Sequence, residues 1–268
     1  MKVAVIGMGS MGTRHANNIK ALGHKAIPYD PAKGWNDWPT GYEAVVVATP
    51  PDQRMSFSVP TLYEKPIASR VSDAFKLTVC DEGSVAYNWR FDPDMTDLYH
   101  EVQSGVSGKP IYAVVDYGFA LDLWRPGTPI YEMPYAVTGI LLEASHELDL
   151  IRWIFGDVHR VTESWVGNTR WEIPAEDTAH AVLHAHGLMI QLSLDMTRPK
   201  YQRRFSVKFD RGTVTVNLDR ENVERTYRAE MEAFLKYVQT GERDYRTATL
   251  SDGIAALNLV HFIKASSR

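Results

Sequence analysis

The sequence predicts an α/β protein, with an N-terminal Rossmann dinucleotide-binding domain followed by an α+β domain that has a mostly antiparallel, open sheet. Three observations predict this. Short apolar runs alternate with polar segments over the first 91 residues, a glycine-rich turn follows the first run, and strands of alternating polarity dominate beyond residue 91. We expect the two domains to span residues 1–91 and 92–268.

The first apolar run, Lys2 to Ile6, is typical of a buried strand and leads directly into three spaced glycines. Gly7 allows a tight turn, Gly9 lets the backbone approach phosphates, and Gly12 lets the following helix, residues 10–22, pack closely. The start of a helix attracts anions through its N–H groups and its dipole. A purely structural glycine turn is the alternative. The residues expected to hold a pyrophosphate are Gly7, Gly9, Ser10, Met11 and Gly12.

A second short strand, residues 25–29, ends at Asp30, 23 residues after Gly7. A carboxylate at this place can accept hydrogen bonds from the ribose hydroxyls of NAD and would repel the additional phosphate of NADP. Lys33 is close enough in sequence to soften that repulsion. We therefore expect NAD, with NADP as the alternative.

Three more apolar runs, 44–48, 61–64 and 84–88, indicate further strands of the same parallel sheet. Ligands bind outside the carboxyl ends of such strands. The link from Pro51 to Pro60 is too short for a full crossover helix, so we expect a trimmed fold with helices missing on one face. The strand ends add these candidate cofactor residues: Thr49, Pro50, Glu64, Lys65 and Asn88.

Beyond residue 91 the pattern predicts a helix over 93–103, a strand over 111–119, and one long helix over 139–155 that Gly156 ends. Asp210 to Gly212 is expected to form a hairpin turn. Two amphipathic helices close the chain, one around 231–238 and one around 254–262. The expected further strands are 158–166, 178–184, 189–194, 204–209 and 213–217.

Lys65 follows a strand end, where an ammonium group could stabilise a developing alkoxide. An ordinary surface lysine is the alternative. On the long predicted helix, Glu143, His146 and Asp149 recur at three-residue steps and share one face with Trp153. Histidine is the natural proton acceptor near neutral pH, and a carboxylate one turn away can fix its tautomer. A pair that only stabilises the helix is the alternative.

Composition excludes several classes of function. A net charge of −4 and a pI near 6.1 give no reason to expect a nucleic acid partner. The one cysteine, Cys80, can form no internal disulfide, which suits the cytoplasm. No apolar run approaches the roughly 18 residues of a membrane span, and the first run lacks the cleavage site of a signal peptide.

Two groups of polar residues have open interpretations. His180, His184 and His186 lack the acidic or cysteine partners of a zinc pattern, so we expect no metal. A basic run could be the solvated face of a sheet or a site for a phosphorylated or carboxylated substrate. Its members are Arg198, Lys200, Arg203, Arg204, Lys208 and Arg211.

Taken in order, the motifs are similar to those of the glucose-fructose oxidoreductase, inositol dehydrogenase and rhizopine catabolism oxidoreductase (Gfo/Idh/MocA) family. The resemblance spans nearly the whole chain. It rests on VAVIGMGSMG from Val3 to Gly12 with His15, ATPP ending at Pro51, EKP from Glu64 to Pro66, YNWRF ending at Phe91, LLEASHELD from Leu141 to Asp149 with Arg152 and Trp153, and EDT from Glu176 to Thr178.

The resemblance implies that Lys65 is the lysine of the EKP motif, that His146 is the acid/base histidine and that Glu143 assists it. It also implies a second domain whose open sheet often forms an oligomer interface, so we expect a homodimer or homotetramer. Trp124-Arg125-Pro126 with Tyr131 resembles a subgroup acting on sialic-acid-like or nucleotide-linked sugars. The candidate substrate residues are Lys65, Arg90, Trp124, Arg125, Tyr131 and His146.

The sequence also departs from the family pattern at three places. Leu142 stands where many members carry an aspartate four residues before the histidine, and the usual glycine run before this helix is reduced to Gly139. The histidine that often follows the TPP turn is replaced near Gln53 and Arg54. The first two departures weaken the transfer of a full catalytic triad.

We therefore predict an NAD(P)-dependent oxidoreductase that transfers a hydride between the nicotinamide and a secondary alcohol of a sugar, sugar derivative or cyclitol. His146 would accept the hydroxyl proton and Lys65 would stabilise the oxyanion. A cofactor-sensing regulator without turnover and an NAD-dependent glycosidase are the alternatives.

Overall fold

The computed structural model describes residues 1–78, 83–124 and 127–267, and the chain divides into two compact units. Unit 1 comprises Met1–Asp92 and Asn222–Leu257, and unit 2 comprises Pro93–Glu221 and Asn258–Arg268. A parallel sheet in the first unit and a mostly antiparallel sheet in the second confirm the predicted fold class. The expected ranges differ from this division at residues 222–257, which pack with the N-terminal unit.

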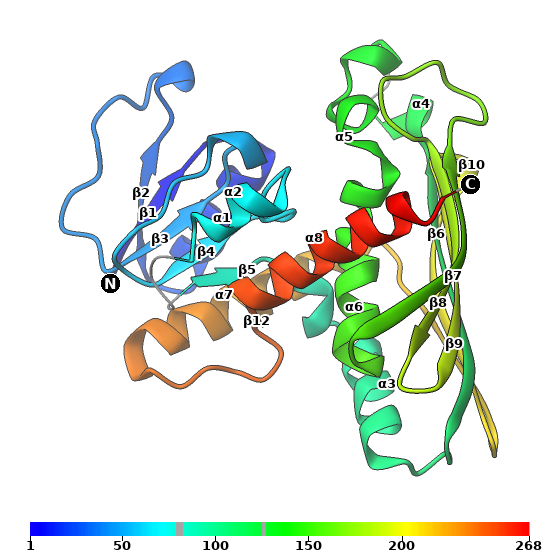
Figure 1. The fold of residues 1–268 in the computed structure, drawn as a ribbon. Coiled ribbons are helices and arrows are strands. Elements are labelled where there is room, and N and C mark those ends of the chain that lie inside the picture. The colour runs from blue at the N-terminus through cyan, green and yellow to red at the C-terminus, as the bar shows by residue number, and fades with distance from the viewer. Residues whose placement is uncertain (79–82, 125–126, 268) are drawn as a thin grey trace. The chain divides into compact units, whose positions relative to one another are not determined.

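Unit 1 is built on a six-stranded sheet in the order β12-β5-β4-β3-β1-β2 (Figure 1). All neighbours pair in parallel except β12, which is antiparallel to β5. The chain passes from β1 to β2 on one side and to β3 on the other, so the strand order reverses between β1 and β3, where such sheets bind ligands. The strands are β1 (Lys2–Ile6), β2 (Lys25–Tyr29), β3 (Ala44–Val47), β4 (Thr61–Tyr63), β5 (Gly83–Val85) and β12 (Ala248–Thr249).

One face of this sheet is covered by α1 (Ser10–Ala21) and α7 (Val223–Thr240). A helix from far along the chain therefore covers part of this face, beside the local helix α1. The expectation of missing helices on one face stays a prediction. Val3, Val5 and Val46 share one core with Met231 and Phe234 of α7. Burial of such side chains contributes roughly 1.5–3 kcal/mol each, which explains why α7 packs with unit 1.

The remaining elements of unit 1 are short or are shared with unit 2. The helix α8 (Leu250–Ala265) begins in unit 1, where a Cβ on Gly253 would lie 2.7 Å from the Val85 side chain. The link from Pro51 to Pro60 contains only the turn η2, as expected. The short helices are α2 (Val71–Phe75), η1 (Pro31–Lys33), η2 (Pro51–Gln53) and η3 (Asn88–Phe91).

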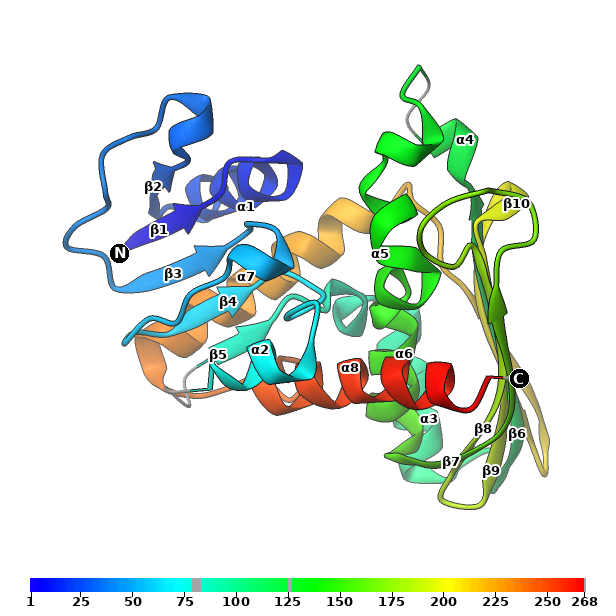
Figure 2. The same ribbon diagram turned by 45° about the horizontal axis from the view of Figure 1, so that its top comes forward.

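Unit 2 contains a second six-stranded sheet in the order β11-β10-β6-β9-β8-β7. Only the pair β6 and β9 is parallel. Figures 1 and 2 show α3, α5 and α6 along one face of this sheet. Asp210 and Arg211 form the expected turn between β10 and β11. The strands are β6 (Pro110–Ala120), β7 (Val158–Gly167), β8 (Thr178–Ala185), β9 (Leu188–Asp195), β10 (Thr197–Phe209) and β11 (Gly212–Asn217).

The helices of unit 2 correct one expectation. The single helix expected over 139–155 is divided into α5 (Pro134–Glu143) and α6 (Ser145–Phe155), with Ala144 between them. Gly139 within α5 has φ 80°, and a Cβ there would lie 2.5 Å from the Glu176 carboxylate. That carboxylate also accepts the Leu141 N–H at 3.2 Å. The other helices are α3 (Pro93–Ser104), α4 (Leu121–Trp124) and η4 (Ile130–Glu132).

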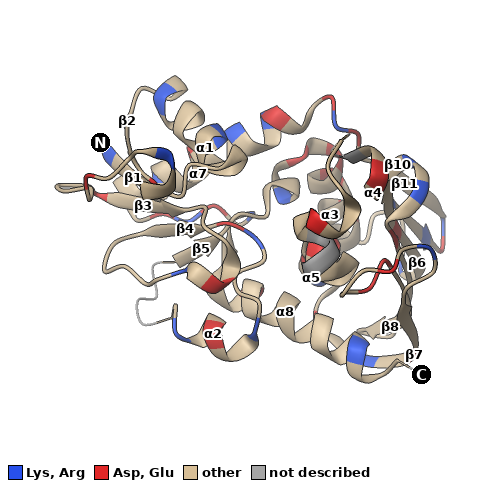
Figure 3. Ribbon diagram, turned by 90° about the horizontal axis from the view of Figure 1, so that it is seen from above, with Lys and Arg blue, Asp and Glu red and all other residues tan. Residues whose placement is uncertain are grey.

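Basic and acidic segments are interspersed along the ribbon (Figure 3). Within the basic run, Arg198 donates to Asp116 at 2.9 Å, and Arg204 lies 3.5 Å from the same carboxylate. Arg203 is instead buried. Arg198 and Arg204 therefore pair with Asp116, whereas Arg203 lies in the interior. Over the described residues, no helix is long and apolar enough to cross a membrane, and no group of three His, Cys, Asp or Glu is placed to hold a metal ion.

Candidate functional site

The three glycines after β1 have different surroundings. Gly7 has φ 88°, and a Cβ there would lie 2.9 Å from the backbone of both Ala48 and Thr49. A Cβ on Gly12 would lie 1.8 Å from the Gly7 carbonyl oxygen. A Cβ on Gly9 would meet no atom within 4 Å. The fold itself therefore accounts for Gly7 and Gly12, whereas the open space at Gly9 is available to a ligand.

The start of α1 and the end of β3 offer hydrogen-bonding groups beside that space. Gly9 caps α1 without a side-chain hydrogen bond, so the first N–H groups, from Ser10 and Met11 on, have no side-chain cap. Thr49 Oγ1 is buried and has no hydrogen-bond partner among the described residues. Pro50 follows on the exposed side. Uncapped N–H groups, an unpartnered hydroxyl and an open glycine fit a dinucleotide diphosphate.

Asp30 at the end of β2 is held against the glycine turn. Its Oδ2 accepts a hydrogen bond from the Met8 backbone N–H at 2.8 Å. Lys33 donates from Nζ to the Met8 carbonyl oxygen, also at 2.8 Å. The Asp30 carboxylate and the Lys33 ammonium group are therefore both hydrogen-bonded to the backbone of Met8.

The EKP motif begins with a buried carboxylate. Glu64 Oε1 lies 2.7 Å from Nε2 of the fully buried His15 of α1, and its Oε2 accepts the Lys65 N–H at 3.1 Å. Burial alone would raise the pKa of Glu64, but the His15 hydrogen bond and the positive charges of His15, Lys65 and Arg54 outweigh it and lower the pKa. An ionised Glu64 thus fixes the backbone from which the Lys65 side chain extends.

Arg54 stands in the segment where the family often has a histidine. Its guanidinium donates to the Pro66 carbonyl oxygen of the EKP motif. Burial lowers the pKa of Arg54 to about 10, although Glu64 and two tyrosines oppose this shift. Arg54 therefore remains a cation at neutral pH and supports the EKP segment.

Two predicted residues of unit 1 are buried in η3. Asn88 is completely buried and donates from Nδ2 to Thr226 Oγ1 of α7 at 2.6 Å, while its Oδ1 has no partner in the described part of the chain. Arg90 is 3% exposed and lies 3.6 Å from the Asp252 carboxylate of α8. Arg90 is therefore buried within unit 1, beside Asp252. Its predicted role toward substrate stays a prediction.

In unit 2 the predicted histidine lies in the first turn of α6. His146 is 5% exposed, and Asp149, one turn later, is completely buried. Glu143 lies at the end of α5, before the break at Ala144, so the one-helix argument for a face shared with His146 does not hold. The charge of Glu143 nevertheless raises the pKa of Tyr117, a member of the buried cluster around Arg203.

That cluster centres on Arg203, which points inward from β10. Its Nε lies 2.5 Å from Oε1 of the fully buried Glu147, and its guanidinium carbon lies 4.3 Å from the centre of the Tyr117 ring. Burial alone would lower the pKa of Arg203, but Glu147 outweighs it and raises the pKa. Burial raises the pKa of Tyr117, and Glu143 adds to that rise. Glu147, directly after His146, is thereby anchored to the sheet.

Sequence reasoning named Arg203 only as a member of the basic run and did not name Tyr117, although a signal for the burial of both was present. Side chains alternate between the faces of a strand. Arg203 therefore shares a face with Phe205 and Phe209, and Tyr117 shares one with Val115. A polar residue at a core position of a strand indicates a buried partner.

The predicted subgroup motif is only partly described. Trp124 ends α4, and Arg125 lies outside the described residues. Tyr131, in η4, is 67% exposed. Their predicted contacts with substrate remain predictions.

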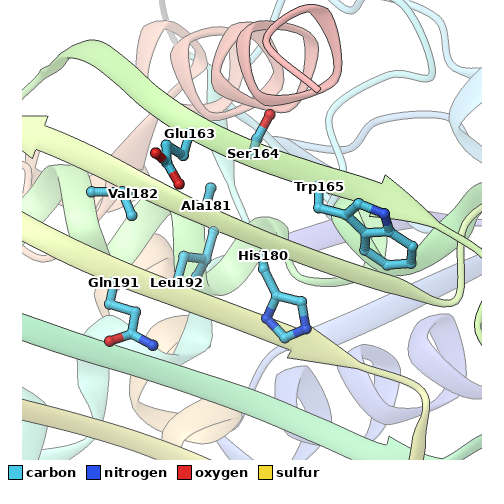
Figure 4. A pocket seen from close by; sticks show the side chains of 8 residues that line it. All are labelled: Glu163, Ser164, Trp165, His180, Ala181, Val182, Gln191 and Leu192. Carbon is cyan, nitrogen blue, oxygen red and sulfur yellow. The ribbon is translucent and has the colours of Figure 1, made fainter. Parts of the chain in front are cut away.

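A cavity of about 300 Å³ lies on the second sheet, and Figure 4 shows the side chains that line it. It is formed by β7, β8 and β9, and the predicted site residues are not among those that line it. The lining residues are Glu163, Ser164, Trp165, His180, Ala181, Val182, Gln191 and Leu192.

Comparisons with known proteins agree with this architecture. Residues 95–215 match the family model described as the GFO/IDH/MocA C-terminal domain. Comparison with curated proteins gives no match.

Solved structures resemble the whole chain. The WlbA dehydrogenase of Bordetella pertussis, in complex with NADH and UDP-GlcNAcA, is 18% identical with a TM-score of 0.82, covering 100% of this chain and 96% of that one. A myo-inositol dehydrogenase of Corynebacterium glutamicum is 17% identical with a TM-score of 0.78, covering 100% and 96%. A scyllo-inositol dehydrogenase of Lactobacillus casei, with bound NAD(H) and scyllo-inositol, is 15% identical with a TM-score of 0.75, at the same coverage. At these identities the likeness establishes the fold.

Three observations agree: the motifs of the sequence, the family model matched by the second unit and the fold of the whole chain. The resemblance drawn from the motifs is confirmed: residues 95–215 match the C-terminal domain of the Gfo/Idh/MocA family, and the whole chain has the fold of solved inositol dehydrogenases.

Proposed function

We propose that this protein is an NAD-dependent oxidoreductase acting on a secondary alcohol of a sugar, sugar derivative or cyclitol. The observation that carries the proposal is the glycine turn, where Gly9 alone of the three glycines faces open space. The uncapped start of α1 and the unpartnered hydroxyl of Thr49 border the same turn. Solved proteins of this fold that contain NAD or NADH with sugar-like ligands support the substrate class.

The residues of unit 1 would bind and orient the dinucleotide. The N–H groups at the start of α1 would hold the diphosphate. Asp30, fixed by Met8, would accept hydrogen bonds from the ribose hydroxyls, which favours NAD over NADP. When bound, the nicotinamide supplies the carbon that accepts or donates the hydride.

The proton chemistry is assigned to two side chains. His146 would accept the proton of the substrate hydroxyl, which an imidazole can do near neutral pH. Lys65 would stabilise the negative charge that develops on the same oxygen. The ionised Glu64 fixes the backbone of Lys65, and the Glu147–Arg203 pair fixes the first turn of α6 that carries His146.

A turnover assay with a panel of sugars and cyclitols tests this function, with the absorbance of the reduced nicotinamide as the readout. Lys65→Met and His146→Asn should each lower kcat by about 10²- to 10⁴-fold while cofactor affinity changes little. Lys76→Met, at an exposed lysine of the same unit, is the matched control and should keep wild-type turnover.

Three outcomes would contradict the proposal in different ways. Wild-type turnover in both variants would remove the assigned roles. NAD binding without turnover on any substrate would identify a cofactor-sensing regulator. Release of a leaving group without net reduction of the cofactor would identify a glycosidase.

A further inference from the structure

The segment that follows Asp30 contains an exposed tryptophan in a fixed place. The turn η1 ends at Gly34, whose φ of 82° reverses the chain. Trp35 then forms an antiparallel bridge with Asp30, in which each backbone N–H donates to the other residue's carbonyl oxygen at 3.0 Å. Two hydrogen bonds to one residue fix the backbone of Trp35 beside Asp30.

The bridge also determines the direction of the indole. Residues directly opposite each other in an antiparallel pair project to the same side, with Cβ atoms about 5.5 Å apart. The Asp30 carboxylate projects toward the glycine turn, where it accepts the Met8 N–H at 2.8 Å. The Trp35 side chain therefore projects to the same side of the backbone as the Asp30 carboxylate, which would hold a ribose.

Trp35 is not explained by packing. It is 49% exposed, and within the described ranges its indole has neither a ring contact nor a hydrogen bond. Trp38, three residues later, is 46% exposed but packs against Tyr29 at 4.7 Å and stacks on Phe57 at 6.5 Å between ring centres. The two tryptophans are therefore about equally exposed, but only Trp38 has aromatic partners among the described residues.

We propose that Trp35 is the platform on which the adenine ring of the dinucleotide stacks. The inference rests on the proposed function and extends it to the part of the cofactor that does not react. The base is joined to the ribose that Asp30 would hold, so it reaches the neighbouring position on the same side. Aromatic stacking suits this place because Trp35 is half exposed.

Titration calorimetry with ADP-ribose tests the proposal, because this ligand has the adenine, ribose and diphosphate but no nicotinamide. Loss of one base–aromatic stack should weaken binding by about 5- to 150-fold in Trp35→Ala. Trp35→Phe keeps an aromatic face and should stay within about threefold of the wild type. The exposed neighbour variant Asn36→Ala is the matched control and should bind as the wild type does.

Fluorescence gives a second readout, independent of activity. ADP-ribose should quench part of the intrinsic tryptophan emission in the wild type, and Trp35→Phe should lose that part while keeping affinity. The melting temperatures of the ligand-free variants should stay close to that of the wild type, since Trp35 is half exposed and its ring contacts no other ring in the described chain.

The failures of this inference and of the proposed function can be distinguished. Equal affinities of the wild type and Trp35→Ala for ADP-ribose would overturn the stacking role alone. Equal losses in Trp35→Ala and Trp35→Phe would also overturn it. No binding of ADP-ribose or NAD to the folded wild type would overturn the proposed function and the stacking role together.

Discussion

The ion pair between Glu147 and Arg203 provides a stringent test of the second unit. Both side chains are almost completely buried, and their atoms approach to 2.5 Å. Removal of one partner leaves an uncompensated buried charge, which costs about 3–5 kcal/mol. At about 2–4 °C per kcal/mol for a unit of this size, Glu147→Gln should lower the melting temperature by about 6–20 °C.

The double variant makes this prediction specific. Glu147→Leu with Arg203→Met removes both charges and retains apolar volume, so it should regain most of the stability lost in either single variant. Asp157→Asn is the control at the other end of α6, because Asp157 is exposed and pairs with Arg152 at 3.0 Å. An exposed pair contributes at most about 1 kcal/mol.

The assay is thermal unfolding followed by circular dichroism for the wild type, Glu147→Gln, Asp157→Asn, the double variant and its two single variants, Glu147→Leu and Arg203→Met. A double variant that loses the sum of the two single losses would refute the reasoning, because coupled buried charges cannot be additive. A Glu147→Gln loss no larger than that of Asp157→Asn would refute it as well.

Three further predictions concern unit 1. Gly12→Ala should destabilise the protein by about 3 kcal/mol or more in urea unfolding, because its Cβ would lie 1.8 Å from a backbone oxygen; wild-type stability would contradict the packing. Since the folded pKa of Glu64 is lowered, its contribution to stability is present above the usual 4.5 and is lost as the pH falls through the lower folded value, so melting temperatures of the wild type and Glu64→Gln should differ at neutral pH and converge in acid. A constant difference down to the acid transition would count against an ionised Glu64. Asp30→Asn should shift the ratio of NADP to NAD affinity toward NADP by about tenfold in calorimetry, and an unchanged ratio would remove Asp30 from cofactor choice.

The glycine turn and the strands of the first sheet could be predicted from sequence because their signals are local. A strand, a spaced glycine turn and a helix follow one another within 22 residues, and the structure gives a steric reason for Gly7 and Gly12 and open space at Gly9. The place of α7 could not be predicted in this way. Its apolar face predicts a buried helix, but nothing in that pattern says which sheet the face will cover.

The second unit shows where local reasoning fails and where it was incomplete. The helix expected over 139–155 is divided at Ala144, and its expected first residue, Gly139, has a positive φ beside the Glu176 carboxylate. A contact across 37 residues cannot be read from periodicity. The inward direction of Arg203 could have been found, since it alternates in step with Phe205 and Phe209. Charge composition drew attention to the whole basic run instead.

Calorimetric titration of NAD into the wild type and Gly9→Ala tests the central claim most directly. The wild type should bind NAD, whereas Gly9→Ala should fold with an unchanged melting temperature and lose binding, because its Cβ would occupy space that no protein atom fills. Gly212→Ala, at another glycine whose Cβ would meet nothing within 4 Å, should bind as the wild type does. Equal NAD affinity in Gly9→Ala and the wild type, or no binding by either, would contradict the account.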